Sequence, residues 1–324
     1  MAYPSAFVLH SDCALHDTGW GHPEHQGRLP AVVRAIEREM PVLLPVLLQQ
    51  EAEPVSEEDL LRVHERALVD AVREAANAAR PGEPVQLDAD TLVSPASWSA
   101  ALAAAGCAVT AAALVADGAA STAFAASRPP GHHATPNRAM GFCLFNNVAV
   151  AARWVQRRRG AGRVLIVDWD VHHGNGTQDI FYEDPSVYFL SLHLSPHYPG
   201  TGAVGERGRG KGLGTTRNVP LGHGTTREEY HAAFDSALEA TLEEFRPEFV
   251  FISAGFDCLA GDPLGGLPLE PVDLHRMTRR IIEWTADSAE GRVIAVLEGG
   301  YVPVRLGHGV VSVLHALAGL EAQD

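Results

Sequence analysis

The sequence predicts a single α/β domain with a central, mostly parallel sheet flanked by helices on both faces. Short apolar runs alternate with longer segments rich in alanine and leucine, which is typical of successive βαβ units. The chain has 324 residues, of which 46% are hydrophobic, so it can bury one large core. No stretch rich in proline, glycine and serine is long enough to indicate a linker between two domains.

Each element follows from its own pattern. Strands are expected in the short apolar runs, at Ala6–Leu9, Thr122–Ala126, Arg163–Val167, Val187–Leu190, Phe249–Ser253 and Val293–Leu297. Helices are expected at Glu57–Leu68, Pro95–Ala116, Asn147–Arg157, Arg227–Phe245 and Pro271–Ser288. Ser56 precedes Asp59, and Thr226 precedes Glu229, at the spacing of helix-capping signals. The glycine-rich stretch Gly200–Gly214 is expected to be a surface loop within the domain.

Composition restricts the partners and the compartment. Acidic residues outnumber basic ones by 40 to 25, so the surface should repel the phosphates of nucleic acid. The four cysteines, Cys13, Cys107, Cys143 and Cys258, form no CxxC pair and indicate free thiols in a reducing compartment. No signal peptide and no apolar stretch of membrane-spanning length is expected. We therefore predict a cytoplasmic protein that contacts neither nucleic acid nor membrane directly, with a homo-oligomer left open.

Polar clusters follow four of the predicted strands. They are RPPGHH at 128–133, DWDVHH at 168–173, GFD at 255–257 and EGGY at 298–301. Open α/β sheets bind their ligands beyond the carboxyl ends of the strands, so these clusters should converge on one crevice.

A metal site is expected in that crevice. Asp170 and His172 are two residues apart in extended chain, so both side chains can face the same way, and Asp257 is the best third ligand. Two aspartates and a histidine with an open position for water form a catalytic zinc site, although iron(II) or cobalt could occupy the same ligands. An isolated DxH pair would indicate only a hydrogen-bonded structural pair. Asp168 is expected to support a catalytic histidine, and His173 to be packed structure or an outer support.

Acid–base groups are expected beside the metal. Histidine side chains ordinarily titrate near neutral pH, so His132 and His133 could move protons, whereas the simpler alternative is two structural histidines in a proline-braced loop. Tyr301 follows two glycines that allow a tight turn, so its phenol could donate to the oxyanion of a tetrahedral intermediate. On its own, GGY would indicate no more than a buried aromatic residue.

Six motifs, in the same order, resemble the histone deacetylase and acetylpolyamine amidohydrolase family. They are RPPGHHA, GFCLFNN, DWDVHHGNGTQ, SLHLSPHYPGTG, AGFDCLAGDPLGG and EGGY. The similarity runs from Gly21 to Tyr301, and Asn175 together with GDPLGG looks like the class II branch and its bacterial relatives. The resemblance implies a single catalytic domain over residues 1–324 with an arginase/deacetylase-like fold, one zinc ion per chain and a structural potassium ion.

The resemblance also implies roles for the polar clusters. Asp170, His172 and Asp257 would bind zinc, His132 and His133 would transfer protons, and Tyr301 would polarise the carbonyl. Which histidine is the principal base is left open, because Asn175 stands where class I members pair the second histidine with aspartate. Asp168 and Ser191 match a potassium site, together with the backbone carbonyls of Asp170, His172 and Leu192.

A narrow acyl-lysine channel is implied as well. Phe142 and Tyr198 match its aromatic walls, Gly141 its floor, and Ser97 a serine that contacts the substrate amide. Asp90 is a candidate rim carboxylate, with a turn or capping role as the alternative. Leu264 stands where acetylpolyamine enzymes carry a glutamate, which disfavours a substrate with a second ammonium.

The leading hypothesis is therefore hydrolysis of N-acyl-lysine, in a protein or peptide, or of a related N-acyl amine. An acetylpolyamine or other small-amide amidohydrolase is the nearest alternative. An arginase-like dimetal hydrolase is disfavoured, because Cys258 and Leu259 follow Asp257 where a second carboxylate would be needed. A non-catalytic acyl-lysine binding module is disfavoured by the intact Tyr301 and the histidine pair.

Overall fold

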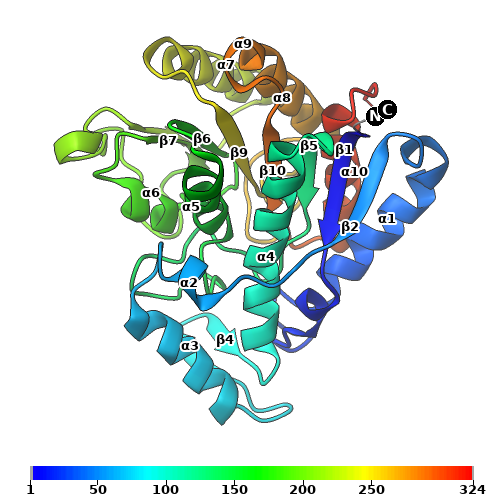
Figure 1. Cartoon of the computed structure of the whole chain (residues 1–324), viewed down its shortest axis with the longest axis vertical. Helices are drawn as coiled ribbons and strands as arrows, with labels where there is room; N and C mark the ends of the chain where they lie inside the picture. The colour runs from blue at the N-terminus through cyan, green and yellow to red at the C-terminus, as the bar shows by residue number, and fades with distance from the viewer. Residues whose placement is uncertain (1–2, 323–324) are drawn as a thin grey trace.

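A large parallel sheet organises the chain, which we describe from a computed structural model over residues 3–322 (Figure 1). The sheet has eight strands in the order β2-β1-β5-β10-β9-β6-β7-β8, and all its pairs are parallel. A separate antiparallel pair, β3 with β4, lies outside it. The expected α/β fold, with a central sheet between layers of helices, is confirmed.

The strands of the large sheet are short and, in the centre, mostly apolar. They are β1 Tyr3–Leu9, β2 Leu47–Glu51, β5 Ala120–Ala125, β6 Val164–Asp168, β7 Val187–Leu194, β8 Thr216–Leu221, β9 Phe249–Ala254 and β10 Val293–Leu297. The small pair is β3 Val85–Asp88 and β4 Thr91–Val93. Every residue of β6, β7, β9 and β10 is buried, as expected of strands covered by helices on both faces.

The helices cover both faces of the sheet. They are α1 Arg28–Leu43, α2 Glu57–Leu60, α3 Arg66–Ala78, α4 Ser97–Ala116, α5 Asn147–Arg159, α6 Asn175–Phe181, α7 Arg227–Glu244, α8 Pro271–Trp284, α9 Ala286–Ala289 and α10 Pro303–Leu317. Two short 3₁₀ turns, η1 Ser11–Leu15 and η2 Gly210–Gly212, complete the structure. Figure 1 shows α4 and α5 on the near face and α10 on the far face, where α1 and α8 pack against it.

Two predicted helices are shorter than expected. The helix predicted at Glu57–Leu68 breaks after Leu60, because His64 turns inward: its Nδ1 bonds the carbonyl of Thr135 at 2.9 Å and its Nε2 accepts the amide N–H of Asn146 at 2.9 Å. The helix predicted at Pro271–Ser288 ends at Trp284 and is followed by the separate α9. Both predicted capping signals are confirmed, at Ser56 and in a full capping box at Thr226.

The expectation about apolar stretches is wrong in one place. Helix α4 has 20 residues and a mean hydropathy of 1.9 over its best window, so by length and composition alone it could cross a membrane. Within the structure, 61% of that window is buried, and α4 packs against α5 and β5. An alanine-rich core helix passes the same composition test, because small apolar side chains allow close packing on both sides.

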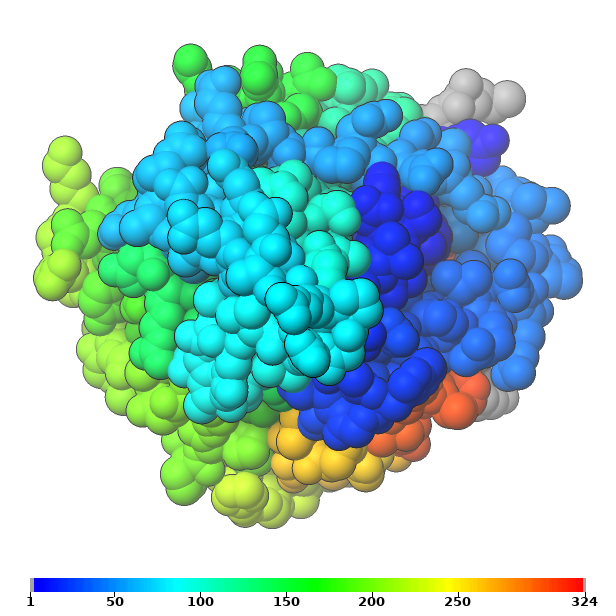
Figure 2. All heavy atoms as spheres, turned by 90° about the horizontal axis from the view of Figure 1, so that it is seen from below, coloured from blue at the N-terminus to red at the C-terminus, as the bar shows by residue number. Residues whose placement is uncertain are grey.

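All eight strands of the large sheet end on the same side of the molecule. In Figure 1 the arrow of β1 points toward the bottom of the view, and Figure 2 looks at the molecule from that end. Segments far apart in the sequence, coloured dark blue, cyan, yellow-green and orange, gather on this face of the molecule. The four polar clusters should therefore lie beneath this face.

Candidate active site

Strand order explains how the four clusters come together. They follow β5, β10, β9 and β6, which are consecutive in the sheet although they are far apart in the chain. The register pairs Asp168 with Ser253, and Leu297 with Ala254, so these strands end at the same level. The sequence-based prediction that the clusters converge is confirmed.

Asp170, His172 and Asp257 form one buried group that could hold a metal ion. One ligand atom from each residue lies within 4.8 Å of the others. Nδ1 of His172 lies 3.0 Å from Oδ1 of Asp170 and 3.3 Å from Oδ2 of Asp257. Backbone amides hold the carboxylates: Val171 donates to Asp257 at 2.9 Å, and Gly299 donates to Asp170 at 2.9 Å.

This group fits a cation. Oδ2 of Asp257 is buried and has no hydrogen-bond partner within residues 3–322. Burial and the neighbouring Asp170 raise the pKa of Asp257 to about 7. Two adjacent buried carboxylates that share one histidine are costly unless a further positive charge joins them, which a divalent metal would supply. A Cβ on Gly299 would lie 2.0 Å from Oδ2 of Asp257, so glycine is needed for this close approach.

The two adjacent histidines have different partners. Nδ1 of His132 hydrogen-bonds Oδ2 of Asp168 at 3.0 Å, whereas Nδ1 of His133 hydrogen-bonds Oδ1 of Asn175 at 2.8 Å. Burial opposes the charge on His132, but Asp170 and Asp168 raise its pKa to about 10. Burial and the neighbouring His132 lower the pKa of His133 well below its usual value. The pair thus offers one imidazole that favours the charged form and one that favours the neutral form.

Tyr301 lies beside the carboxylates and is held from two sides. Its amide N–H donates to Oδ2 of Asp262 at 2.7 Å, and the guanidinium of Arg28 lies 5.2 Å from the centre of its ring. Burial and the charge of Asp257 raise the pKa of Tyr301 well above its usual value. The phenol therefore stays protonated and can donate a hydrogen bond.

A cavity of about 310 Å³ leads to these groups. Its lining consists of Asp90, His133, Gly141, Phe142, His172, His197, Tyr198, Pro263, Leu264, Gly265 and Tyr301. The expected channel residues Gly141, Phe142, Tyr198 and Leu264 are all in its wall. His133 is in the wall as well, whereas His132 is not. His197 also contributes: its Nε2 bonds the carbonyl of Leu264 at 2.9 Å, and its ring stacks on that of His172.

A tight turn presents Phe142 to the cavity. Met140 and Cys143 exchange two backbone hydrogen bonds, and the residues between them, Gly141 and Phe142, have φ values of +56° and +67°. These values are those of a primed hairpin turn, in which a phenylalanine is strained. Asp90 accepts the amide N–H of Gly141 at 3.1 Å, so the rim carboxylate also anchors the turn. A Cβ on Gly141 would lie 2.4 Å from the ring of His133.

The expected role of Ser97 is wrong. Ser97 is buried at the start of α4, where its Oγ lies 2.7 Å from Nδ1 of His16 and accepts the amide N–H of Ser94 at 2.7 Å. The sequence pattern identified a serine near the right helix, but the side chain points into the core and its hydrogen bonds are already satisfied. Asp90 is the polar residue that lines the cavity on this side.

The supporting residues lie beside the site. Asp168 accepts the amide N–H of Asp170 at 3.1 Å and pairs in register with Ser191 of β7. His173 is part of packed structure, because its two ring nitrogens bond Thr201 and Gln178.

All four cysteines are free and buried, in agreement with the sequence analysis.

Sequence reasoning missed one buried ionic network. Oε1 of Glu24 accepts hydrogen bonds from Arg28 at 2.9 Å and Arg128 at 2.7 Å, and all three side chains are fully buried. Arg28 also donates to the carbonyls of Glu298 and Gly300, next to Tyr301. The HPEHQGR segment carries Glu24 and Arg28, so an acid and a base four residues apart were visible in the sequence, but nothing there showed that they are buried.

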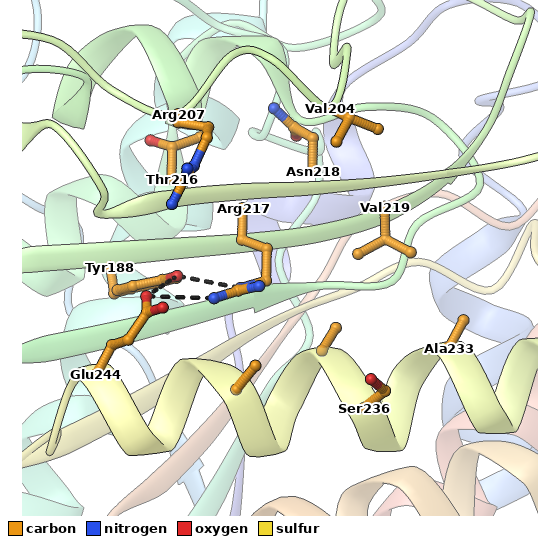
Figure 3. Close-up of a pocket in the computed structure, with 12 residues that line it drawn as sticks. Tyr188, Val204, Arg207, Thr216, Arg217, Asn218, Val219, Ala233, Ser236 and Glu244 are labelled. Atoms are coloured by element: carbon orange, nitrogen blue, oxygen red, sulfur yellow. Dashed lines mark hydrogen bonds and ion pairs between the residues drawn. The ribbon is translucent and has the colours of Figure 1, made fainter.

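A larger cavity, of about 510 Å³, lies elsewhere, between β8, α7 and the loop before β8 (Figure 3). Its charged groups largely satisfy each other, because Arg217 contacts the phenol of Tyr188 and the carboxylate of Glu244. No histidine lines it, and none of the strand-end clusters reaches it. Size alone is therefore a poor guide here, and the smaller cavity is the candidate active site.

The chain is similar to known proteins in both sequence and fold. Residues 22–317 match the family model described as the histone deacetylase domain. Histone deacetylase 10, chloroplastic, of Oryza sativa subsp. japonica is 38% identical over 312 residues, covering 92% of this chain and 70% of that protein. The histone deacetylase-like amidohydrolase of Pseudomonas aeruginosa is 38% identical over 276 residues, covering 84% of this chain and 70% of that protein. The crystal structure of the HDA15 HD domain matches with a TM-score of 0.91 and 37% identity, covering 99% of this chain and 90% of that one.

Proposed function

We propose that this chain, which belongs to the histone deacetylase family, is a zinc-dependent deacetylase that hydrolyses the amide of an N-acyl-lysine or a related N-acyl amine. One observation carries the proposal. The buried group of Asp170, His172 and Asp257, in which Oδ2 of Asp257 accepts no hydrogen bond within residues 3–322, adjoins a cavity together with His133 and Tyr301.

Asp170, His172 and Asp257 would hold the zinc ion. When bound, zinc would lower the pKa of a coordinated water and polarise the substrate carbonyl. Three protein ligands leave a position open, as catalytic sites require. A potassium ion near Asp168 and Ser191 is a further part of the proposal, supported by the register that pairs these two residues in neighbouring strands.

The chain's own groups would move protons and stabilise charge. His133 lines the cavity and is the better candidate to exchange protons with water and with the leaving amine. His132 lies deeper, bonded to Asp168, and would stabilise that exchange through its charge. The protonated phenol of Tyr301 would donate to the oxyanion that forms from the carbonyl.

The cavity walls suit an acylated alkyl amine. Phe142 and Tyr198 supply aromatic surface for the methylene chain of a lysine, and Asp90 supplies an acceptor for peptide N–H groups at the mouth. Leu264 adds no charge there, which favours acyl-lysine over a polyamine. The pairing of His133 with Asn175 supports a place in the class II branch.

A small N-acyl amine, such as an acetylated polyamine, is the second candidate substrate. The formal charge of −15 and the carboxylate of Asp90 in the cavity wall favour a cationic ligand over an uncharged one. We also propose, from the composition, that the protein acts in the cytoplasm without direct contact with nucleic acid or membrane.

A side-by-side assay tests the proposal. Purified protein, stripped of metal and then titrated with zinc, is given acetyl-lysine peptides, longer-chain acyl-lysine peptides and acetylated polyamines. We expect amine release that rises with zinc to one equivalent per chain and is highest on acyl-lysine. Tight binding of acyl-lysine peptides with no turnover would favour the binding-module alternative instead. Turnover that does not depend on the zinc concentration would contradict the metal assignment.

A further inference from the structure

Glu298, at the end of β10, is a buried carboxylate that pairs with no cation within residues 3–322. Its side chain is fully buried. Oε2 accepts two backbone amides, from Gly131 at 2.6 Å and from His132 at 3.1 Å. Oε1 has no hydrogen-bond partner among the described residues. A carboxylate in such surroundings is expensive to bury, so its contacts indicate what it does.

Both amide donors belong to the loop that carries the two histidines. The opposite side of that loop is held by α5 and α6: Asn147 donates to the carbonyl of Pro129 at 3.0 Å, and the amide of Thr177 donates to the carbonyl of His132 at 3.2 Å. Glu298 accepts the two backbone hydrogen bonds that tie the loop to the end of β10. Without them, two buried N–H groups would lose their acceptor, and the backbone at Gly131 and His132 would lose its hydrogen bonds to the end of β10.

The same strand end also reaches the other parts of the site. Gly299, the next residue, donates its amide to Asp170, and Tyr301 follows two residues later. A single segment of four residues therefore contacts the histidine loop and a candidate metal ligand, and it carries the proposed oxyanion donor. A shift of about 1 Å in one catalytic group can cost about a hundredfold in rate, so holding these parts in register matters for turnover.

We propose that Glu298 is a positioning residue, whose Oε2 fixes the backbone of Gly131 and His132 and thereby the orientation of the His132 and His133 rings in the cavity. This inference rests on the proposed function, because it assigns the histidines to proton transfer. Hydrogen-bond acceptance, and not the negative charge, is the property that the geometry requires.

Two variants separate these properties. Glu298→Gln keeps one carbonyl oxygen that can accept both amides but removes the charge, whereas Glu298→Met keeps the volume and removes the acceptor. We expect Glu298→Gln to retain kcat within about fivefold, and Glu298→Met to lose about a hundredfold in kcat with a nearly unchanged KM and full zinc content. Ser127→Ala is the matched control: it breaks the 2.8 Å hydrogen bond to the carbonyl of Leu297, between the same two strand ends, without touching the histidine loop.

A readout on the metal-free protein makes the test independent of catalysis. Amide hydrogen exchange of the peptide that contains Gly131 and His132 should be slow in the wild type, in Glu298→Gln and in Ser127→Ala, and faster in Glu298→Met. If Glu298→Gln is as slow in turnover as Glu298→Met, the charge matters and the proposal is wrong. Unchanged exchange in Glu298→Met would also overturn it. An inactive wild type with the expected exchange pattern would instead count against the proposed function and leave the positioning of the loop supported.

Discussion

Two buried aspartates of this protein, Asp257 and Asp273, have opposite surroundings. Asp273, at the start of α8, receives two hydrogen bonds from Arg227 at 2.7 and 2.9 Å, one from His231 at 2.7 Å and one from the amide of Glu270 at 2.8 Å. These partners outweigh burial and hold the pKa of Asp273 well below its usual value. Asp257 has no cation of its own beyond the shared His172, and burial raises its pKa to about 7.

The difference teaches how to recognise a site among buried charges. Asp273 ties α7 to α8 and needs nothing further, because the chain supplies its counter-charge. Oδ2 of Asp257 accepts no hydrogen bond within residues 3–322, and its one ion-pair contact, with His172 at 3.3 Å, is shared with Asp170. Burial of a carboxylate is common to both, and the missing partner is what indicates a ligand.

The largest expected effect comes from Asp257→Asn. The amide keeps the shape but removes a charge, so zinc affinity should fall by more than the roughly 10–100-fold that losing an outer partner of a ligand costs. The metal-free variant should nevertheless be more stable than the metal-free wild type, because one of two adjacent buried carboxylates, which repel each other, loses its charge. Elemental analysis after zinc addition checks the loss of zinc affinity, and denaturation of both metal-free proteins checks the gain in stability. Full zinc occupancy in the variant would exclude Asp257 as a ligand.

Tyr301→Phe should have the next largest effect, and on rate alone. Removing one donor to a developing oxyanion typically costs about 10²–10³ in kcat, whereas zinc binding and folding do not require the hydroxyl. Steady-state kinetics with acetyl-lysine peptide and a zinc measurement check this. Tyr188→Phe removes a buried hydroxyl from the larger cavity and serves as the control, with a kcat close to that of the wild type. A near-native kcat in Tyr301→Phe would remove the oxyanion role.

Asp273→Asn should affect stability and leave the chemistry intact. Loss of the charge that holds Arg227 and His231 should cost about 1–3 kcal/mol of unfolding free energy at neutral pH, with kcat and zinc content unchanged. Since the folded-state pKa is lowered, the contribution is present above the unfolded-state pKa of about 4 and is lost as the pH falls further. Urea denaturation of both proteins at pH 7 and pH 3 should therefore show a difference that shrinks in acid. If Asp273→Asn lost activity but no stability, Asp273 would belong to the site and would not be a structural carboxylate.

The smallest expected effect is on the pH dependence of stability, and it comes from comparing two buried histidines, His133 and His64. Within residues 3–322, His133 forms a hydrogen bond through Nδ1 only, whereas both ring nitrogens of His64 bond the backbone. Burial lowers the pKa of His64 to about 4. The unfolded chain takes up the proton near pH 6.5, so stability should fall by about 2 kcal/mol per such histidine between pH 7 and pH 5. Denaturation curves across this range should be flatter for His64→Gln, which cannot take up a proton. An equal slope in both proteins would mean that other groups dominate.

The sequence was most informative where polar residues directly follow a buried strand. All four polar clusters were found because each directly follows a continuous apolar run, and such runs mark buried parallel strands. The edge strands were missed because their sequences look like loops: β2 is LLQQE and β8 is TRNVPL, with polar residues and a proline that a strand tolerates only at an edge. Helix α1 was missed because Pro41 lies inside it.

Tertiary contacts decided the rest. Ser97 has a hydroxyl that could bind a substrate amide and lies at the start of the expected helix, but this hydroxyl is hydrogen-bonded to His16, 81 residues earlier. Asp273 looks like an ordinary capping residue, and its ion pair with Arg227 spans 46 residues. Glu298 was noticed only as part of EGGY, because its acceptor role depends on a loop 167 residues away. Such contacts leave no local pattern that a single sequence could reveal.

The position of β10 in the sheet has a consequence for synthesis. This strand, Val293–Leu297, follows all the other described strands in chain order, yet it lies between β5 and β9 in the middle of the sheet. Until it has left the ribosome, the nascent sheet exists as two halves, β2-β1-β5 and β9-β6-β7-β8, each with an open apolar edge. Such edges invite pairing with other chains, so this period is when the nascent protein most needs a chaperone. The insertion of β10 would then join the two halves and place the histidine loop and Tyr301 beside the candidate metal ligands.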